Sequence, residues 1–226
     1  MLSMTKFSDI KGFVFDLDGV ITDTSILHGK AWHQLADSLG VTWSDELGNG
    51  LKGISRMDSL EMILKAGGKE NDYTQAEKEQ LATQKNTNYV AEVDKMTPAN
   101  ILPGMKAFLD DLRAKGYQLS LASASKNAPR VLAKLELADY FPKIVDPASL
   151  THGKPDPEIY TKGAELLNLP PEQCIGVEDA AAGVAAINAA GEISLGIGDA
   201  TELGAADMVF ADTADVTLAN IAAKLD

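Results

Sequence analysis

The fold is decided by the stretch Phe13-Val14-Phe15-Asp16-Leu17-Asp18-Gly19-Val20-Ile21-Thr22-Asp23. Its first three residues are apolar without a break, which is typical of a strand covered on both faces of a parallel sheet. Gly19 allows the sharp turn that follows. Asp16 and Asp18 therefore lie at the carboxyl end of the strand, where open α/β sheets bind ligands. Two acids in a loop are usually only solvated, but the strand before them and the glycine after them favour a functional site.

The composition is that of a soluble globular protein with a sizeable core, because the 226 residues are 45% hydrophobic and 23% charged. The formal net charge of -13 argues against nucleic acid or an anionic membrane as a partner, since their phosphates would not be neutralised. That charge is compatible with a small phosphorylated ligand held by a few local cations.

Cys174 is the single cysteine, which excludes an intramolecular disulfide and fits a reducing cytoplasm. Its apolar neighbours favour a buried structural thiol over a nucleophile. No apolar stretch reaches the ~18 residues of a transmembrane helix, and the first residues lack the core of a signal peptide. We expect a cytoplasmic protein, and nothing in the sequence demands more than a monomer.

The chain divides into a helical block and a block of alternating strands and helices. From about Thr24 to Thr97 the apolar residues recur at helical spacing and no strand pattern occurs. Further along, strands are expected at 117–122, 143–145, 174–177, 193–197 and 208–210, separated by helices at 105–115, 128–137, 157–167 and 180–190. This alternation predicts a Rossmann-like three-layer α/β/α core with a parallel sheet. The core comprises residues 1–23 and 98–226, and residues 24–97 form an inserted all-helical cap whose two linkers act as a hinge.

Polar side chains of complementary type follow three of the predicted strands and the loop before one helix. They are Asp16 and Asp18, then Ser123, Ser125, Lys126 and Asn127, then Lys154, and finally Glu178 and Asp179. A parallel sheet gathers strand ends at one edge, so these acids, lysines and hydroxyls indicate an oxygen-ligated divalent cation beside a phosphate. The acids would repel one another without a metal and a lysine. The alternative for Glu178 and Asp179 is that they cap the next helix.

This set of motifs resembles the haloacid-dehalogenase (HAD) superfamily of phosphatases and phosphomutases. Within it the chain is similar to the β-phosphoglucomutase group. The stretches that carry this closer similarity are residues 19–24 with His28, residues 51–56 with Asp58 and Ser59, Lys85-Asn86 with Asn88-Tyr89, and residues 122–127. The resemblance implies a HAD-like core and a Mg²⁺-dependent interconversion of β-D-glucose 1-phosphate and D-glucose 6-phosphate. The implied intermediate is β-D-glucose 1,6-bisphosphate, which also serves as activator.

The resemblance also implies roles for the core residues. Asp16 would be the nucleophile that forms an aspartyl phosphate, and Asp18 the general acid and base. One Mg²⁺ per chain would be bound by Asp16, the Asp18 carbonyl and Asp179, with Glu178 nearby. Ser123 and Lys154 would hold the transferring phosphate. The distal, non-reacting phosphate would be held by Arg56, Ser125, Lys126 and Asn127, with the arginine binding its oxygens bidentately, and Ala124 is a further implied substrate-binding residue.

Residues of the helical block have less specific signals. His28 on a helix is more often a packing or surface residue, but the resemblance implies that it orients Asp18. Lys85 lies on a polar helix where solvated lysines are usual, and its role in positioning Asp18 or the sugar is a weaker inference. The further substrate-binding residues implied are Lys52, Gly53, Ile54, Ser55 and Ser59, and Thr24 is the implied hinge residue. The glycine suits a close approach of backbone to ligand.

Two other functions fit the same residues. A HAD-type sugar-phosphate phosphatase would need only water as acceptor and no second phosphate site, so the distal clamp argues for the mutase. A non-catalytic phosphosugar-binding module would not need Asp16, Asp18, Lys154 and Asp179 to be intact.

Overall fold

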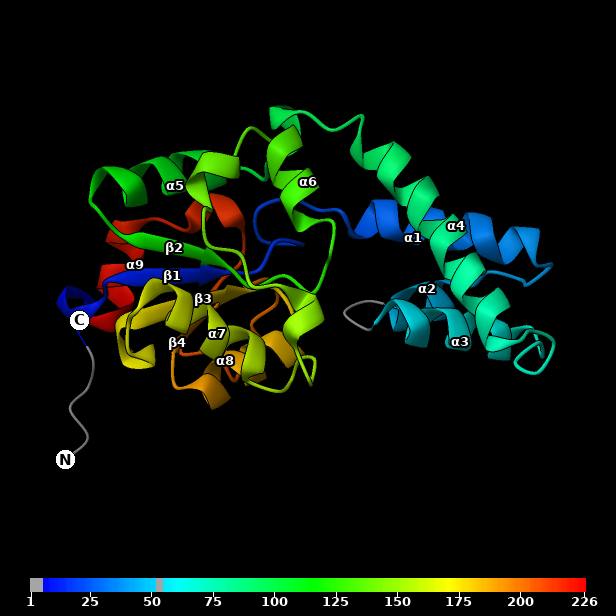
Figure 1. Ribbon diagram of the computed structural model, residues 1–226. Coiled ribbons are helices and arrows are strands. Elements are labelled where there is room, and N and C mark those ends of the chain that lie inside the picture. The colour runs from blue at the N-terminus through cyan, green and yellow to red at the C-terminus, as the bar shows by residue number, and fades with distance from the viewer. Residues whose placement is uncertain (1–5, 52–54) are drawn as a thin grey trace. The chain divides into compact units, whose positions relative to one another are not determined.

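The computed structural model describes residues 6–51 and 55–226, and these form two compact units (Figure 1). One unit comprises residues 1–23 and 97–226, and the other comprises residues 24–96. The predicted α/β core with a parallel sheet is confirmed, and a helical unit is inserted after the first strand. None of the helices in the described part combines the length and apolarity that a membrane span requires.

The α/β unit is built on a five-stranded parallel sheet in the order β2-β1-β3-β4-β5. Its strands are β1 (Gly12–Phe15), β2 (Gln118–Leu121), β3 (Cys174–Glu178), β4 (Ile193–Ile197) and β5 (Met208–Phe210). The chain runs from β1 to β2 on one side and then crosses to β3 on the other side. The order of the strands therefore reverses at β1, and the carboxyl end of β1 is the point where such sheets bind ligands.

Helices cover both faces of this sheet (Figure 1). They are α5 (Met105–Ala114), α6 (Ala128–Lys134), α7 (Glu158–Leu167), α8 (Ala181–Ala190) and α9 (Leu218–Leu225). The apolar run of β1 packs against helices. Phe13 and Phe15 stack edge-on against Phe108 of α5. Val14 packs in a cluster with Tyr160 of α7. Every residue of β1 is buried, as the unbroken apolar pattern predicts.

The helical unit contains α1 (Ser25–Ser38), α2 (Asp45–Gly50), α3 (Arg56–Ala66) and α4 (Gln75–Val93). Helix α4 packs against α1 and α3, and α2 against α3. Thr74 and Glu77 form a capping box at the start of α4. The apolar sides of these helices meet in one core that includes Trp32, Leu60 and Ile63.

The segments of the α/β unit that precede and follow the inserted helices are hydrogen-bonded to each other, and we call this pairing the pinned junction. Thr22 pairs with Ile101 in an isolated bridge, and the Leu102 amide donates a hydrogen bond to the Ile21 carbonyl at 2.9 Å. The Thr22 hydroxyl donates to the Asn100 carbonyl at 2.7 Å. The segments before and after the helical unit are therefore joined to each other within the α/β unit.

Three sequence expectations about elements were wrong. The strand expected at 143–145 is reduced to a single bridge between Ile144 and Leu121, in a segment bounded by Pro142 and Pro147, which lack amide donors. Two helices were missed. Both have a side-chain cap: Ser44 accepts from the Leu47 amide before α2, and Thr217 accepts from the Asn220 amide before α9.

Glu192 is an acid buried in the core at the edge of β4, 4% exposed. Neither carboxyl oxygen has a hydrogen-bond partner among the described protein groups. Burial alone raises the pKa of Glu192 well above its ordinary value. The unfolded chain therefore releases this proton at a lower pH than the folded chain does. The stability that this group confers is present at low pH and is lost as the pH rises from the unfolded pKa to the folded one.

Replacement of Glu192 by glutamine is expected to remove this pH dependence. In the wild type the free energy of unfolding should fall by up to about 1.4 kcal/mol per pH unit through this group once the pH exceeds the pKa of an ordinary glutamate, so the variant should gain stability relative to wild type as the pH is raised. Urea unfolding at several pH values measures the difference. Glu172→Gln, at an exposed position, is the control and should follow the wild-type profile. Parallel profiles for wild type and Glu192→Gln would contradict the prediction.

Candidate active site

The carboxyl ends of β1, β2 and β3 bring three of the predicted site segments to one edge of the sheet. Backbone hydrogen bonds continue past the strands: the Asp16 amide donates to the Val177 carbonyl at 2.9 Å, and the Ala122 amide donates to the Phe15 carbonyl at 2.7 Å. Asp16 is therefore fixed by its own backbone next to the residues that follow β2 and β3. Its position follows from the register of the sheet.

Lys154 joins two of these strand ends through its ammonium group. Its Nζ lies 2.9 Å from Asp16 Oδ1 and is also hydrogen-bonded to Glu178 Oε1. The three side chains are only 13%, 11% and 2% exposed. Burial acts to lower the pKa of Lys154, but the nearby carboxylates of Asp16 and Glu178 outweigh it and raise that pKa above its usual range. Lys154 is thus a fixed positive charge in the site.

Three carboxyl groups lie close enough together to share one cation. Oxygens of Asp16, Glu178 and Asp179 all lie within 4.8 Å of one another. Burial, then the charges of Glu178 and Asp18, raise the pKa of Asp16 to about 8 against the opposing effect of Lys154. The pKa of Asp179 is raised to about 7 by burial and by the same two acids. When all three carboxyl groups are ionised, the one ammonium leaves two negative charges in excess, which is the charge that a divalent cation compensates.

The chemistry of this donor set fits Mg²⁺, which prefers oxygen ligands and is usually held by a few carboxylates. Gly19 belongs to the same arrangement. Its φ is +71°, and a Cβ atom there would stand 1.9 Å from Asp179 Oδ2. Only glycine therefore leaves room for the Asp179 carboxylate beside the loop that follows Asp18. Asp18 itself is half-buried in that loop.

Glu178 is held from three directions. Its Oε2 accepts hydrogen bonds from the amides of Asp179 and Ala180, both at 3.0 Å, while its Oε1 faces Lys154. A Cβ atom on Gly183 of α8 would stand 1.9 Å from the Glu178 carboxyl carbon. Glu178 does not cap α8, because the amides that it binds precede the first residue of that helix, Ala181. Sequence reasoning missed Gly183, which lies in an alanine-rich helix without any distinguishing signal.

The loop after β2 carries the remaining predicted core residues. Ser123 is buried, and its hydroxyl accepts from the Ser125 amide at 3.2 Å. The Asn127 amide donates to the Ser125 hydroxyl at 3.3 Å, while Ala124 and Lys126 are exposed. The loop thus turns on its own serine hydroxyls and presents polar groups at the same sheet edge as Asp16.

In the helical unit the structure brings His28 and Lys85 together. Lys85 Nζ lies 2.7 Å from His28 Nδ1, and the His28 ring stacks on Tyr89 with centroids 3.9 Å apart. Lys85 is 3% exposed and its ammonium lies 4.5 Å from the Trp32 ring centroid. The alternative that Lys85 is merely a solvated lysine is excluded, because α4 turns that side chain into the core of the unit, while its role toward the substrate stays a prediction.

His28 is neutral in this environment. Burial, then the positive charges of Lys85 and Arg56, lower the pKa of His28 to about 3. The ammonium of Lys85 can only donate, so His28 Nδ1 accepts and the ring proton is assigned to Nε2. His28 is therefore a hydrogen-bond donor through Nε2.

The other predicted residues of this unit stabilise α3. Ser55 caps the helix, its hydroxyl accepting from the Asp58 amide at 3.2 Å, and the Ser59 hydroxyl donates to the Ser55 carbonyl at 2.9 Å. Arg56 Nη2 donates to Asn86 Oδ1 at 2.9 Å. Thr24 is the N-cap residue of α1 and the first residue of the unit. Lys52, Gly53 and Ile54 lie outside the described residues.

Comparisons with known proteins agree with this geometry. A family model described as haloacid dehalogenase-like hydrolase matches residues 10–191. The chain is 43% identical over 209 residues to a β-phosphoglucomutase of Bacillus subtilis (strain 168), covering 92% of each chain. It is 30% identical over 187 residues to a phosphorylated carbohydrates phosphatase of Thermotoga maritima, covering 80% of this chain and 82% of that one.

The solved structure of a β-phosphoglucomutase from Clostridium difficile superposes with a TM-score of 0.91 at 42% identity, covering 96% of this chain and 97% of that chain. The resemblance inferred from the motifs around Asp16, Lys154 and Glu178 is thereby confirmed. This chain belongs to the haloacid dehalogenase-like hydrolase family.

Proposed function

We propose that the protein is a Mg²⁺-dependent phosphomutase that interconverts β-D-glucose 1-phosphate and D-glucose 6-phosphate. The observation that carries this proposal is the buried group of Asp16, Lys154, Glu178 and Asp179, in a chain 43% identical to a β-phosphoglucomutase over nearly its full length. A carboxylate at the end of the central strand, beside a fixed ammonium and a cation-binding group, suits transfer of a phosphoryl group to protein.

Asp16 is the proposed nucleophile. One of its carboxylate oxygens forms a bond to phosphorus as the bond between phosphorus and the sugar oxygen breaks, and the sugar oxygen takes a proton from Asp18. The reverse step passes the phosphoryl group from Asp16 to the free hydroxyl of a sugar monophosphate, whose proton Asp18 accepts, so that β-D-glucose 1,6-bisphosphate forms. Bound Mg²⁺ would offset the repulsion between the anionic nucleophile and the anionic phosphate. Lys154 and Ser123 hold the oxygens of the transferring phosphate.

The ionisation of Asp16 supports this assignment. A pKa of about 8 leaves much of Asp16 protonated near pH 7 in the metal-free protein. The same carboxyl must be anionic to attack phosphorus. A cation held by Asp16, the Asp18 carbonyl and Asp179, one per chain, favours the ionised form and so couples metal binding to nucleophile activation.

The sugar intermediate is β-D-glucose 1,6-bisphosphate in this proposal. This intermediate must reorient in the site between the two half-reactions so that each of its phosphates can approach Asp16. In the α/β unit, residues 125–127 are assigned to the distal phosphate and Ala124 to the substrate. In the helical unit we assign Arg56 to the same phosphate. Residues 52–55, Ser59 and Lys85 are assigned to binding the substrate. His28 is assigned to orienting Asp18. Thr24 is the proposed hinge, and we propose a cytoplasmic monomer.

A phosphatase acting on phosphorylated sugars is the second candidate, because a phosphatase of that kind in Thermotoga maritima is 30% identical to this chain. The two enzymes would share Asp16, Asp18, Lys154 and the cation. They differ in the acceptor of the phosphoryl group, which is a sugar hydroxyl in the mutase and water in the phosphatase.

Product analysis separates these two functions. The protein is incubated with Mg²⁺, a trace of β-D-glucose 1,6-bisphosphate and either anomer of glucose 1-phosphate, and ³¹P NMR follows the products. We expect glucose 6-phosphate from the β anomer and none from the α anomer. Inorganic phosphate without glucose 6-phosphate would reject the mutase in favour of the phosphatase.

A further inference from the structure

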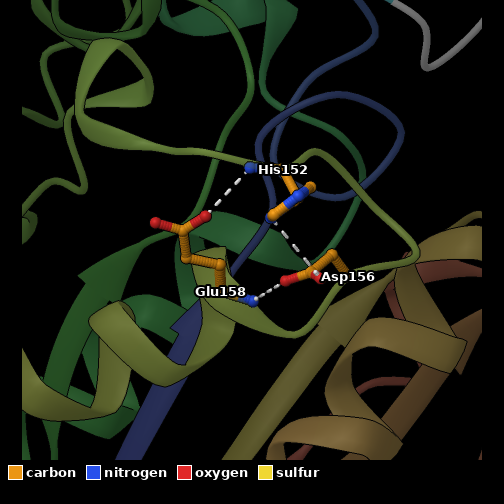
Figure 2. A group of neighbouring side chains, drawn as sticks. All are labelled: His152, Asp156 and Glu158. Carbon is orange, nitrogen blue, oxygen red and sulfur yellow. Dashed lines mark hydrogen bonds and ion pairs between the residues drawn. The ribbon is translucent and has the colours of Figure 1, made fainter.

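The loop that carries Lys154 is tied to helix α7 by one carboxylate. Glu158 is the first residue of α7, and Figure 2 shows it with His152 and Asp156, which lie on either side of Lys154 in the sequence. The loop runs from Thr151 to Pro157 and contains no regular strand or helix. Its shape therefore depends on local turns and on side-chain contacts.

Glu158 supplies most of these contacts. Its Oε2 accepts hydrogen bonds from the Thr151 amide at 2.7 Å and the His152 amide at 2.9 Å. Its Oε1 accepts from Lys162 Nζ, one turn along α7, at 2.7 Å. These donors lower the pKa of Glu158 to about 2, with Lys162 as the largest cause, so the side chain is ionised at neutral pH.

The far side of the loop is closed by Asp156. Its Oδ1 accepts from the Glu158 amide at 3.0 Å, and its own amide donates to the Gly153 carbonyl at 3.0 Å. Before Lys154 in the sequence, the backbone amides of Thr151 and His152 are thus bound to Glu158. After Lys154, the Asp156 amide is bound to the Gly153 carbonyl. Lys154 is the one residue of this loop whose ammonium reaches Asp16 and Glu178 in the described structure.

We propose that Glu158 is a positioning residue for Lys154: by holding the Thr151 and His152 amides at the start of α7, it sets the point from which the Lys154 ammonium reaches Asp16. This inference rests on the proposed function only where it concerns catalysis, in which Lys154 holds the transferring phosphate. A displacement of about 1 Å in such a group can cost about 10²-fold in rate.

The two carboxylate oxygens of Glu158 have different partners. Variants can therefore remove these contacts in part or completely. Glutamine keeps one oxygen for the two amides but places an NH₂ group toward Lys162. Alanine removes both sets of contacts. Glu165→Ala is the matched control, because Glu165 is an exposed residue of the same helix.

The test measures Lys154 directly and activity separately. Acetic anhydride labels lysines at limiting reagent, and mass spectrometry of peptides gives the labelling rate of Lys154 relative to that of the exposed Lys115. We expect the Lys154 rate to rise several-fold in Glu158→Ala and less in Glu158→Gln. The mutase kcat should fall by about 10²-fold in Glu158→Ala, with partial rescue in Glu158→Gln and no change in Glu165→Ala.

The labelling result decides the proposal whatever the enzyme's activity. An unchanged Lys154 rate in folded Glu158→Ala would overturn it, even if kcat fell. A raised rate with unchanged kcat would support positioning by Glu158 and remove Lys154 from the proposed mechanism. If circular dichroism shows that Glu158→Ala does not fold, Glu158→Gln carries the same test, and wild-type labelling with wild-type kcat in that variant would overturn the proposal.

Discussion

Replacement of Asp16 by asparagine is expected to lower kcat by at least about 10⁴-fold, the loss typical of removing a nucleophile. The amide has nearly the same shape as the carboxyl group, so the backbone bond to Val177 and the packing of β1 persist. It cannot form an acyl phosphate at neutral pH. Acid-quenched wild-type enzyme mixed with β-D-glucose 1,6-bisphosphate should gain the mass of one phosphoryl group, and the variant should not.

Asp139→Asn provides the control for this experiment, because Asp139 is exposed and lies in the short helix Ala138–Tyr140. It should turn over and carry the phosphoryl group like the wild type. Full activity of Asp16→Asn would remove Asp16 as nucleophile. A wild type that binds phosphosugar with neither turnover nor label would instead favour the non-catalytic binding module.

Gly183→Ala is expected to reduce kcat by about 10²-fold or more while the fold is retained. The added methyl would stand 1.9 Å from the Glu178 carboxyl carbon, so that carboxylate must move. Glu178 cannot move without releasing Lys154 or the amides of Asp179 and Ala180. Affinity for Mg²⁺, measured by isothermal titration calorimetry, should fall together with kcat.

The matched control is the reverse exchange in the same helix. Ala185 lies on the exposed side of α8, and Ala185→Gly should lower the free energy of unfolding by about 1 kcal/mol through helix propensity. Its kcat and Mg²⁺ affinity should equal those of the wild type. Unchanged activity in Gly183→Ala would mean that the position of Glu178 is not critical.

The centre of the site could be predicted from the sequence because its residues are bound to strand ends. Phe13 to Phe15 indicated a buried parallel strand, and the structure places Asp16 at its carboxyl end beside Glu178. Backbone pairing alone determines that neighbourhood, so local patterns were sufficient. The two-sided burial of β1 followed from the same apolar run.

The contacts that hold the site could not be predicted, because they depend on packing between distant segments. Lys85 belongs to a helix of polar composition, and only the meeting of α1 with α4 places it against His28 and Trp32. Glu158 and Gly183 belong to ordinary helical patterns, and their importance comes from neighbours outside those helices. No periodicity in one sequence records such pairings.

The pinned junction formed by Thr22, Asn100 and Ile101 has a consequence for how this enzyme can diversify. The segments before and after the insertion are hydrogen-bonded to each other within the α/β unit. The two ends of the inserted chain are therefore held together by contacts that do not involve the helices between them. The helices of the inserted unit can be lengthened, shortened or replaced together without disturbing the register of β1. Changes in the helical unit can therefore leave the group of Asp16, Lys154 and Glu178 unaltered.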